Sequence, residues 1–150
     1  MASGMLTGIF RDLIEIEFGL EAEAIDIIHD NNNIIIDMNT RKLYAGLNSR
    51  GQSLESIRGF YAPKTIAIKK SEGQPTDRVT LRDTGDFYEG FYVNASSAMW
   101  HLSSNDEKTD ELIKQWGSDI FGNTNEDERE FNVEYILPGL IEWILQNLKL

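Results

Sequence analysis

The stretch at residues 79–91, VTLRDTGDFYEGF, constrains the fold more than any other part of the sequence. Val79 and Leu81 alternate with polar neighbours, a period of two that predicts a short, half-buried strand. The triplet Asp83-Thr84-Gly85 predicts a turn, because an Asp side chain can bond the backbone two residues on and Gly accepts a positive φ. The aromatic residues of DFYEGF follow at helical spacing and predict a short helical turn. We therefore expect a strand, a turn and a helical turn that pack against one another here, and we call residues 79–91 the joint.

Two helical patterns precede this joint. Apolar residues between positions 6 and 18 recur mostly at i, i+3 and i+4, which predicts an amphipathic helix that loosens near Gly19. Residues 21–45 carry a similar stripe, interrupted by the poor helix formers Asn31-Asn32-Asn33. Alternation at 33–38 also fits a strand. We favour a long helix that ends at Gly46, because the stripe resumes in phase and Gly suits the position just beyond a helix end.

Residues 48–78 predict little regular structure. The segment is polar at its start and is punctuated by Gly59, Pro63, Gly73 and Pro75. Residues 65–69 alternate weakly and fit either a short strand or a helical turn. We expect an extended basic arm over about 48–78, which either reaches a neighbouring molecule or forms a flexible surface loop.

A β hairpin and two capped helices follow the joint. Residues 91–95 and 98–103 predict paired strands with a turn at 94–97. Ser104 and Glu107 predict a capping box that opens a helix ending at Gly117. Thr124 predicts the start of a last helix, which Pro138 should kink or restart. At 150 residues, the chain is expected to form a single domain spanning residues 1–150.

Composition and charge exclude several classes of protein. The net charge of −11 argues against nonspecific nucleic-acid binding, which needs clustered Lys and Arg. No apolar run approaches the roughly 18 residues of a membrane span, and the N-terminus lacks the pattern of a secretory signal. The absence of cysteine excludes disulfides and thiolate metal sites, and it suits a reducing compartment.

The charge is unevenly distributed along the chain. Between positions 58 and 82, six basic residues stand against two acidic ones. Between positions 106 and 134, ten acidic residues stand against three basic ones. Such a dipolar surface can dock copies of the chain side by side in a ring, or meet an oppositely charged partner. The simpler interpretation is two solvated faces.

The triplet Asp83-Thr84-Gly85 is also the signature of aspartic proteases. In those enzymes the catalytic Asp lies in a buried apolar setting, because two carboxylates must share one proton. Here Arg82 precedes the triplet and Asp86 follows it, where the protease pattern has apolar or small residues. We therefore favour the turn over a hydrolase that uses Asp83.

No other constellation predicts chemistry. Asp26, His29 and Asp30 can share a helix face and ligate a metal, but exposed polar residues with this spacing are common. No phosphate-binding loop, dinucleotide fingerprint or nucleophile elbow is present. The tryptophans are expected in the core or at a protomer interface: Trp100, Trp116 and Trp143. We expect no catalytic, cofactor-binding or metal-binding residues.

The joint and the elements after it resemble a known family. The sequence LRDTGDF at 81–87 is similar to the L-x-D-T-G-x-L joint of tailed-phage tail-completion and neck proteins, also called virion morphogenesis proteins. In that family a hairpin, a helix ending in Gly, a short F-L-G-L stretch and a capped helix follow in order. In this sequence the hairpin corresponds to residues 91–103 and the helix ending in Gly to 107–117. The short stretch corresponds to 120–123, and Thr124 opens the last helix. Phe87 and Asn123 depart from the usual Leu and apolar residue, and the similarity covers about residues 40–150.

The resemblance implies a small α+β protomer, with long N-terminal and C-terminal helices packed on one face of a small antiparallel sheet. It implies a structural virion protein without enzymatic activity: a homo-oligomeric ring at the head–tail junction that joins the portal (connector) complex to tail proteins. Such a protein is expected in the virion and, during assembly, in the bacterial host cytoplasm. The alternative is a small acidic cytoplasmic binding or adaptor module, and a more remote one is an aspartic-type hydrolase.

Overall fold

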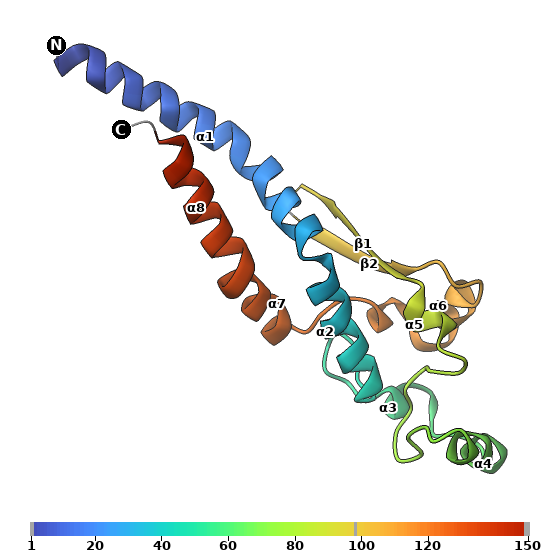
Figure 1. Cartoon of the computed structure of the whole chain (residues 1–150). Helices are drawn as coiled ribbons and strands as arrows, with labels where there is room; N and C mark the ends of the chain where they lie inside the picture. Colours follow the sequence, from blue (N-terminus) through green and yellow to red (C-terminus); the bar gives the residue numbers. More distant parts are fainter. Residues whose placement is uncertain (1, 98, 149–150) are drawn as a thin grey trace.

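The computed structural model describes residues 2–97 and 99–148 and shows an elongated molecule (Figure 1). Two long helices run in opposite directions at one end, a β hairpin lies in the middle, and short helices form the other end. The elements in chain order are α1 (Ala2–Asp30), α2 (Asn32–Tyr44), α3 (Leu54–Arg58), α4 (Pro63–Ser71), α5 (Asp86–Glu89), β1 (Phe91–Ser96), β2 (Met99–Ser104), α6 (Thr109–Trp116), η1 (Ser118–Ile120), α7 (Asn125–Phe131), η2 (Asn132–Ile136) and α8 (Leu137–Asn147).

The N-terminal half of the chain is helical as predicted, but the helix breaks at a different residue. α1 continues through Gly19, so the loosening expected there is wrong. Gly19 instead makes room for the ring of Trp143, since a Cβ at this position would lie 2.5 Å from it. The break falls at Asn31, whose side-chain amide donates to the carbonyl four residues back at 2.9 Å. α2 ends two residues before Gly46 (φ +82°), and the alternative strand at 33–38 is wrong because these residues lie within α2.

The sheet is a two-stranded antiparallel hairpin, and the helices pack on one face of it, which confirms the α+β prediction. Phe91 lies opposite Ser104, and Ser96 lies opposite Met99. Ala98, expected in the second strand, lies outside the described residues. The core against the inner face joins α1, α2, both strands and α7, through Ile28, Ile35, Met38, Val93, Leu102 and Phe131. A second buried cluster fills the other end of the molecule, with Leu43, Leu54, Val79, Phe87, Phe91 and Ile120.

The joint packs as expected, but its strand is wrong. Residues 79–82 form no strand, because Leu81 adopts φ +55° and the side chain of Thr80 is fully buried rather than facing solvent. The Thr80 amide donates to the hydroxyl of Tyr61 at 2.9 Å, and the hydroxyl of Tyr88 donates to the Thr80 carbonyl. Burial raises the pKa of Tyr88. These side-chain hydrogen bonds replace the strand ladder that the alternating pattern had predicted.

The turn and the aromatic face of the joint are confirmed. Gly85 adopts φ +106°, which an L side chain tolerates poorly. The ring of Phe87 meets that of Phe91 edge-on, with centroids 5.1 Å apart. Tyr88 stacks on Phe91 with centroids 5.4 Å apart. The Asp86 amide donates to the Thr84 hydroxyl, so Thr84 supplies the short-range bond that was expected of Asp83.

The segment at 48–78 is more ordered than predicted. It contains the helices α3 and α4, which the expectation of a mostly irregular arm did not include, although most of residues 48–78 lie outside them. The weakly alternating residues 65–69 lie within α4, so of the two alternatives the helical one is confirmed. Pro63 begins α4, where its missing amide costs no helical hydrogen bond. Two side chains connect the segment to the joint. The Tyr61 hydroxyl accepts from the Thr80 amide, and the Lys69 ammonium donates to the Arg82 carbonyl at 2.5 Å.

The capping box predicted at Ser104 and Glu107 is wrong, because α6 begins later, at Thr109. The Ser104 hydroxyl instead donates to the Phe87 carbonyl at 2.9 Å, and the Thr109 hydroxyl donates to the Ser104 carbonyl. The end of this helix is confirmed at Gly117 (φ +85°). The expected restart near Pro138 is also confirmed, since a π-helical turn, η2, precedes α8 and Pro138 lies in the first turn of α8.

The cap predicted at Thr124 is confirmed and gives a first testable prediction. Its hydroxyl accepts a hydrogen bond from the Asp127 amide at 3.2 Å. Thr124→Ala should lower the free energy of unfolding by about 1 kcal/mol, because one amide at the start of α7 loses its acceptor. Urea unfolding followed by circular dichroism measures the change. Thr124→Ser keeps the hydroxyl and should stay close to the unsubstituted chain, so equal losses in both variants would contradict the capping role.

Candidate assembly surfaces

The carboxylate of Asp83 is exposed to solvent rather than buried. Its side chain is 77% exposed, and Oδ2 lies 3.2 Å from Lys108 Nζ. This hydrogen bond is the main cause that raises the pKa of Lys108. A proton-sharing dyad needs an enclosed, apolar setting, in which like charges cannot both ionise. The surroundings of Asp83 therefore give no support to the hydrolase interpretation.

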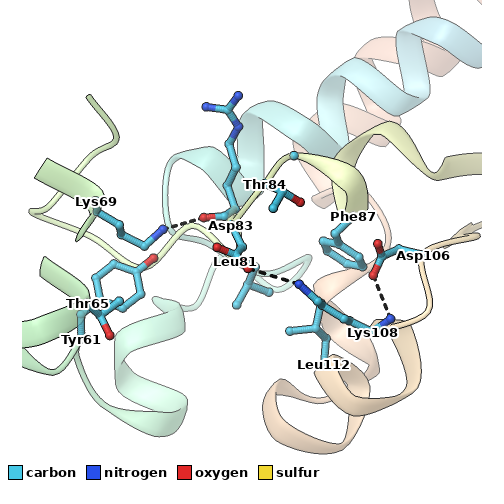
Figure 2. Close-up of a pocket in the computed structure, with 12 residues that line it drawn as sticks. Tyr61, Thr65, Lys69, Leu81, Asp83, Thr84, Phe87, Asp106, Lys108 and Leu112 are labelled. Carbon is cyan, nitrogen blue, oxygen red and sulfur yellow. Dashed lines mark hydrogen bonds and ion pairs between the residues drawn. The ribbon is translucent and has the colours of Figure 1, made fainter. Parts of the chain in front are cut away.

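The joint and α4 enclose a pocket of about 260 Å³ (Figure 2). Leu81, Phe87 and Leu112 supply its apolar lining. Two of its three basic side chains have partners inside the molecule, since Lys69 donates to the Arg82 carbonyl and Lys108 pairs with Asp83; the third is Arg82. The pocket is small beside the roughly 300–1,000 Å³ of typical small-molecule sites.

A second pocket, of about 330 Å³, adjoins the first. Tyr61 and Thr65 line both pockets. Phe60 and Trp116 line the second, together with Arg58, whose guanidinium lies 5.9 Å from the centre of the Trp116 ring. The two pockets together form a hollowed surface beside α3, α4 and α6.

The metal site considered at Asp26, His29 and Asp30 finds no support. Within residues 2–97 and 99–148, no group of three His, Cys, Asp or Glu side chains is arranged to hold a metal ion. Asp26, His29 and Asp30 are exposed near the end of α1. The three tryptophans are partly buried: Trp100 against Phe131, Trp116 under Arg58 and Trp143 against Gly19.

Most of the exposed large apolar side chains lie on the two long helices, α1 and α8. We call residues 2–21 of α1 together with α8 the stalk (Figure 1). α1 turns Ile9 and Ile16 inward, and Ile16 is buried. Four further apolar residues follow the spacing i, i+4, i+7 and i+8, so they share a different face of the helix: Leu6, Phe10, Leu13 and Ile14. All four are exposed, and Phe10 is 64% exposed.

α8 repeats this arrangement. Trp143 and Ile144 are half-buried, whereas Leu137, Ile141 and Leu145 are exposed at i, i+4 and i+8. The stalk is thus apolar on the surface between its helices and again on its outside. A helix that is apolar on more than one side is typically buried in a larger structure. Exposed apolar side chains gathered on one surface are typical of interaction sites.

The stalk is also acidic. Within residues 2–21 there are four acidic residues against Arg11, and α8 carries Glu142 with no basic residue. Glu17 and Glu21 continue the exposed apolar face of α1 toward the middle of the molecule, since they follow Phe10 by 7 and 11 residues. Burial, with the nearby Asp26 and Asp30, raises the pKa of Glu23.

The opposite end of the molecule is basic and carries its own exposed apolar residues. We call residues 50–82 the basic end; its seven basic residues are Arg50, Arg58, Lys64, Lys69, Lys70, Arg78 and Arg82, against three acidic ones. Exposed apolar side chains lie among them: Ile57, Phe60 and Ile68. Lys64 and Ile68 share one face of α4, at i and i+4. Both pockets open at this end.

Sequence reasoning located the basic end but not the stalk surface. The apolar stripe at 6–18 predicted an amphipathic helix without saying what its apolar face contacts, and the structure leaves most of the stripe exposed. The available signal was its width: apolar residues from Leu6 to Phe18 occupy more of the helix than one buried face needs.

Comparisons with protein-family models, curated proteins and solved structures found no significant match for this chain. Among the described residues, no helix is both long and apolar enough to cross a membrane.

Proposed function

We propose that this chain is a structural virion protein of a tailed phage, which assembles as a homo-oligomeric ring at the head–tail junction and has no enzymatic activity. The observation that carries the proposal is the exposed apolar surface of the stalk, on Leu6, Phe10, Leu13 and Ile14 of α1 and on three leucine or isoleucine side chains of α8. Copies that pack side by side in a closed ring would remove this surface from water.

The order of elements supports the same assignment. A turn at Asp83-Thr84-Gly85, a hairpin, a helix ending at Gly117 and a last helix capped by Thr124 follow one another as the resemblance to neck proteins implies. The stretch at 120–123 is anchored to α2, because Lys42 donates to the carbonyls of Ile120 and Gly122. The elements that the resemblance names are therefore parts of the folded core rather than loose loops.

The proposed partners are further copies of the chain, the portal or connector complex and tail proteins. The proposed location is the virion, and the bacterial host cytoplasm during assembly. The net charge of −11 disfavours contacts with nucleic acid. A small acidic adaptor module is the second candidate, and the acidic stalk would then bind one basic partner.

Assembly of the purified chain, and its addition to portal-bearing particles, test the proposal. We expect rings in negative-stain electron microscopy, or added density at the single portal vertex. Phe10→Ser with Ile14→Ser should weaken association about 100-fold, because two apolar side chains no longer leave water on assembly. Sedimentation velocity measures association in solution, and vertex occupancy measures it on particles.

Met99→Ser is the matched control, since Met99 is 58% exposed on the β hairpin and lies outside the stalk. It should leave assembly unchanged. A chain that stays monomeric and ignores portal-bearing particles would contradict the ring. Recovery of a complex with one basic protein, in a one-to-one ratio, would instead support the adaptor.

A further inference from the structure

Resting on the proposed ring, we infer that its contact is between unlike surfaces: the acidic, apolar stalk of one copy docks on the basic end of the next copy. The occupant of the stalk surface is thus a second copy of this chain, bound through residues 50–82. A ring of more than two copies already requires a contact between unlike surfaces, but it does not decide which two surfaces meet.

Charge argues against the stalk docking on another stalk. The stalk bears five acidic residues and one arginine, so two stalks face to face would bring like charges together. Like charges juxtaposed in an interface cost several kcal/mol. The basic end has seven basic residues against three acidic ones and offers the complementary sign within the same chain.

Both proposed contact surfaces, the stalk and the basic end, also carry exposed apolar side chains next to their charged ones. Glu17 and Glu21 lie along the same α1 face as Phe10 and Ile14. On the basic end, Lys64 lies beside the exposed Ile68 on α4, and the two adjoining pockets have room for apolar side chains. Each surface thus combines apolar side chains with one sign of charge, as interface surfaces that select a partner do.

The placement of the two surfaces allows the contact to repeat. The stalk and α4 lie at opposite ends of the elongated molecule (Figure 1). One copy therefore leaves both surfaces free for two different neighbours. A contact between unlike surfaces produces a ring when its rotation closes and an open filament when it does not.

Charge reversal on each surface tests the inference. The stalk-reversed variant carries Glu17→Lys and Glu21→Lys, and the end-reversed variant carries Lys64→Glu and Lys70→Glu. All four side chains are exposed, so folding should be preserved. Each variant alone should associate at least about tenfold more weakly than the unsubstituted chain in low salt. An equimolar mixture should associate again, because each reversed surface meets its complement on the other variant.

A matched control carries Glu130→Lys and Glu134→Lys, which make the same charge change on exposed residues outside the stalk. It should associate normally and should not restore association to the end-reversed variant. Rings of the end-reversed variant with undiminished affinity would overturn the inference while leaving the proposed function in place. An unsubstituted chain that neither associates nor adds to portal-bearing particles would overturn both.

Discussion

Replacing Lys42 with methionine should lower the free energy of unfolding by about 3 kcal/mol. Lys42 is buried on α2, and its Nζ lies within hydrogen-bonding distance of three acceptors: Asn39 Oδ1 at 2.9 Å, the Ile120 carbonyl at 3.1 Å and the Gly122 carbonyl at 2.6 Å. Methionine restores the apolar stem but not the donors. Three buried acceptors would then lose their partner, which costs more than the hydrogen bonds contribute net. Urea unfolding measures the loss.

The same side chain should make stability depend on pH. Burial lowers the pKa of Lys42 to about 7, against the opposing pull of the Asp127 and Asp119 carboxylates. In the unfolded chain its pKa returns to about 10.4. Between these values the unfolded chain binds one more proton than the folded chain, so stability rises with pH. The difference in unfolding free energy between the unsubstituted chain and Lys42→Met should therefore grow from pH 7 to pH 10.

Lys114→Met is the control, because Lys114 is exposed on α6. It should change stability by less than about 0.5 kcal/mol and should leave the pH profile unaltered. Equal losses in the two variants, or a difference for Lys42→Met that stays constant from pH 7 to pH 10, would contradict the role given to this buried amine.

Local chemistry made much of the fold predictable from the sequence. Gly46, Gly85 and Gly117 mark a helix end, a turn and a second helix end, and all three adopt positive φ. Thr124 caps the helix that it was expected to open. Each of these positions depends on steric limits or hydrogen bonds within a few residues, so the neighbouring sequence carries the information.

Contacts between distant residues decided the rest. Thr80 is buried because Tyr61 and Tyr88 satisfy its backbone, and the spacing of residues 79–82 alone indicated a strand. Lys42 donates to carbonyls about 80 positions away in the sequence, and no local sequence pattern predicts such a contact. For the stalk, the apolar stripe itself was recognised from the sequence. Periodicity does not say, however, whether the surface that covers such a stripe belongs to the same chain or to another one.

Phe131→Ala should have the largest effect on stability of any single change considered, about 3–5 kcal/mol. Its ring is fully buried at the end of α7, 5.2 Å from the ring of Trp100 and 5.1 Å from that of Tyr135, measured between centroids. Phe131 connects α7 to the sheet and to α2 within one hydrophobic cluster. Alanine would leave a cavity among side chains held by four different elements, which cannot all move in to fill it.

The change should also loosen the stalk. No side chain of α8 is fully buried, so the position of this helix depends on its junction with η2, which follows α7, and on packing against α1. Hydrogen exchange should therefore accelerate at the amides of α8 before it does in α2. Phe131→Leu, which fills most of the space, should cost about 1.5 kcal/mol and leave the exchange of α8 slow. Unchanged exchange in α8 for Phe131→Ala would mean that contacts with α1 alone hold the stalk together, and the proposed assembly surface would then not depend on the core.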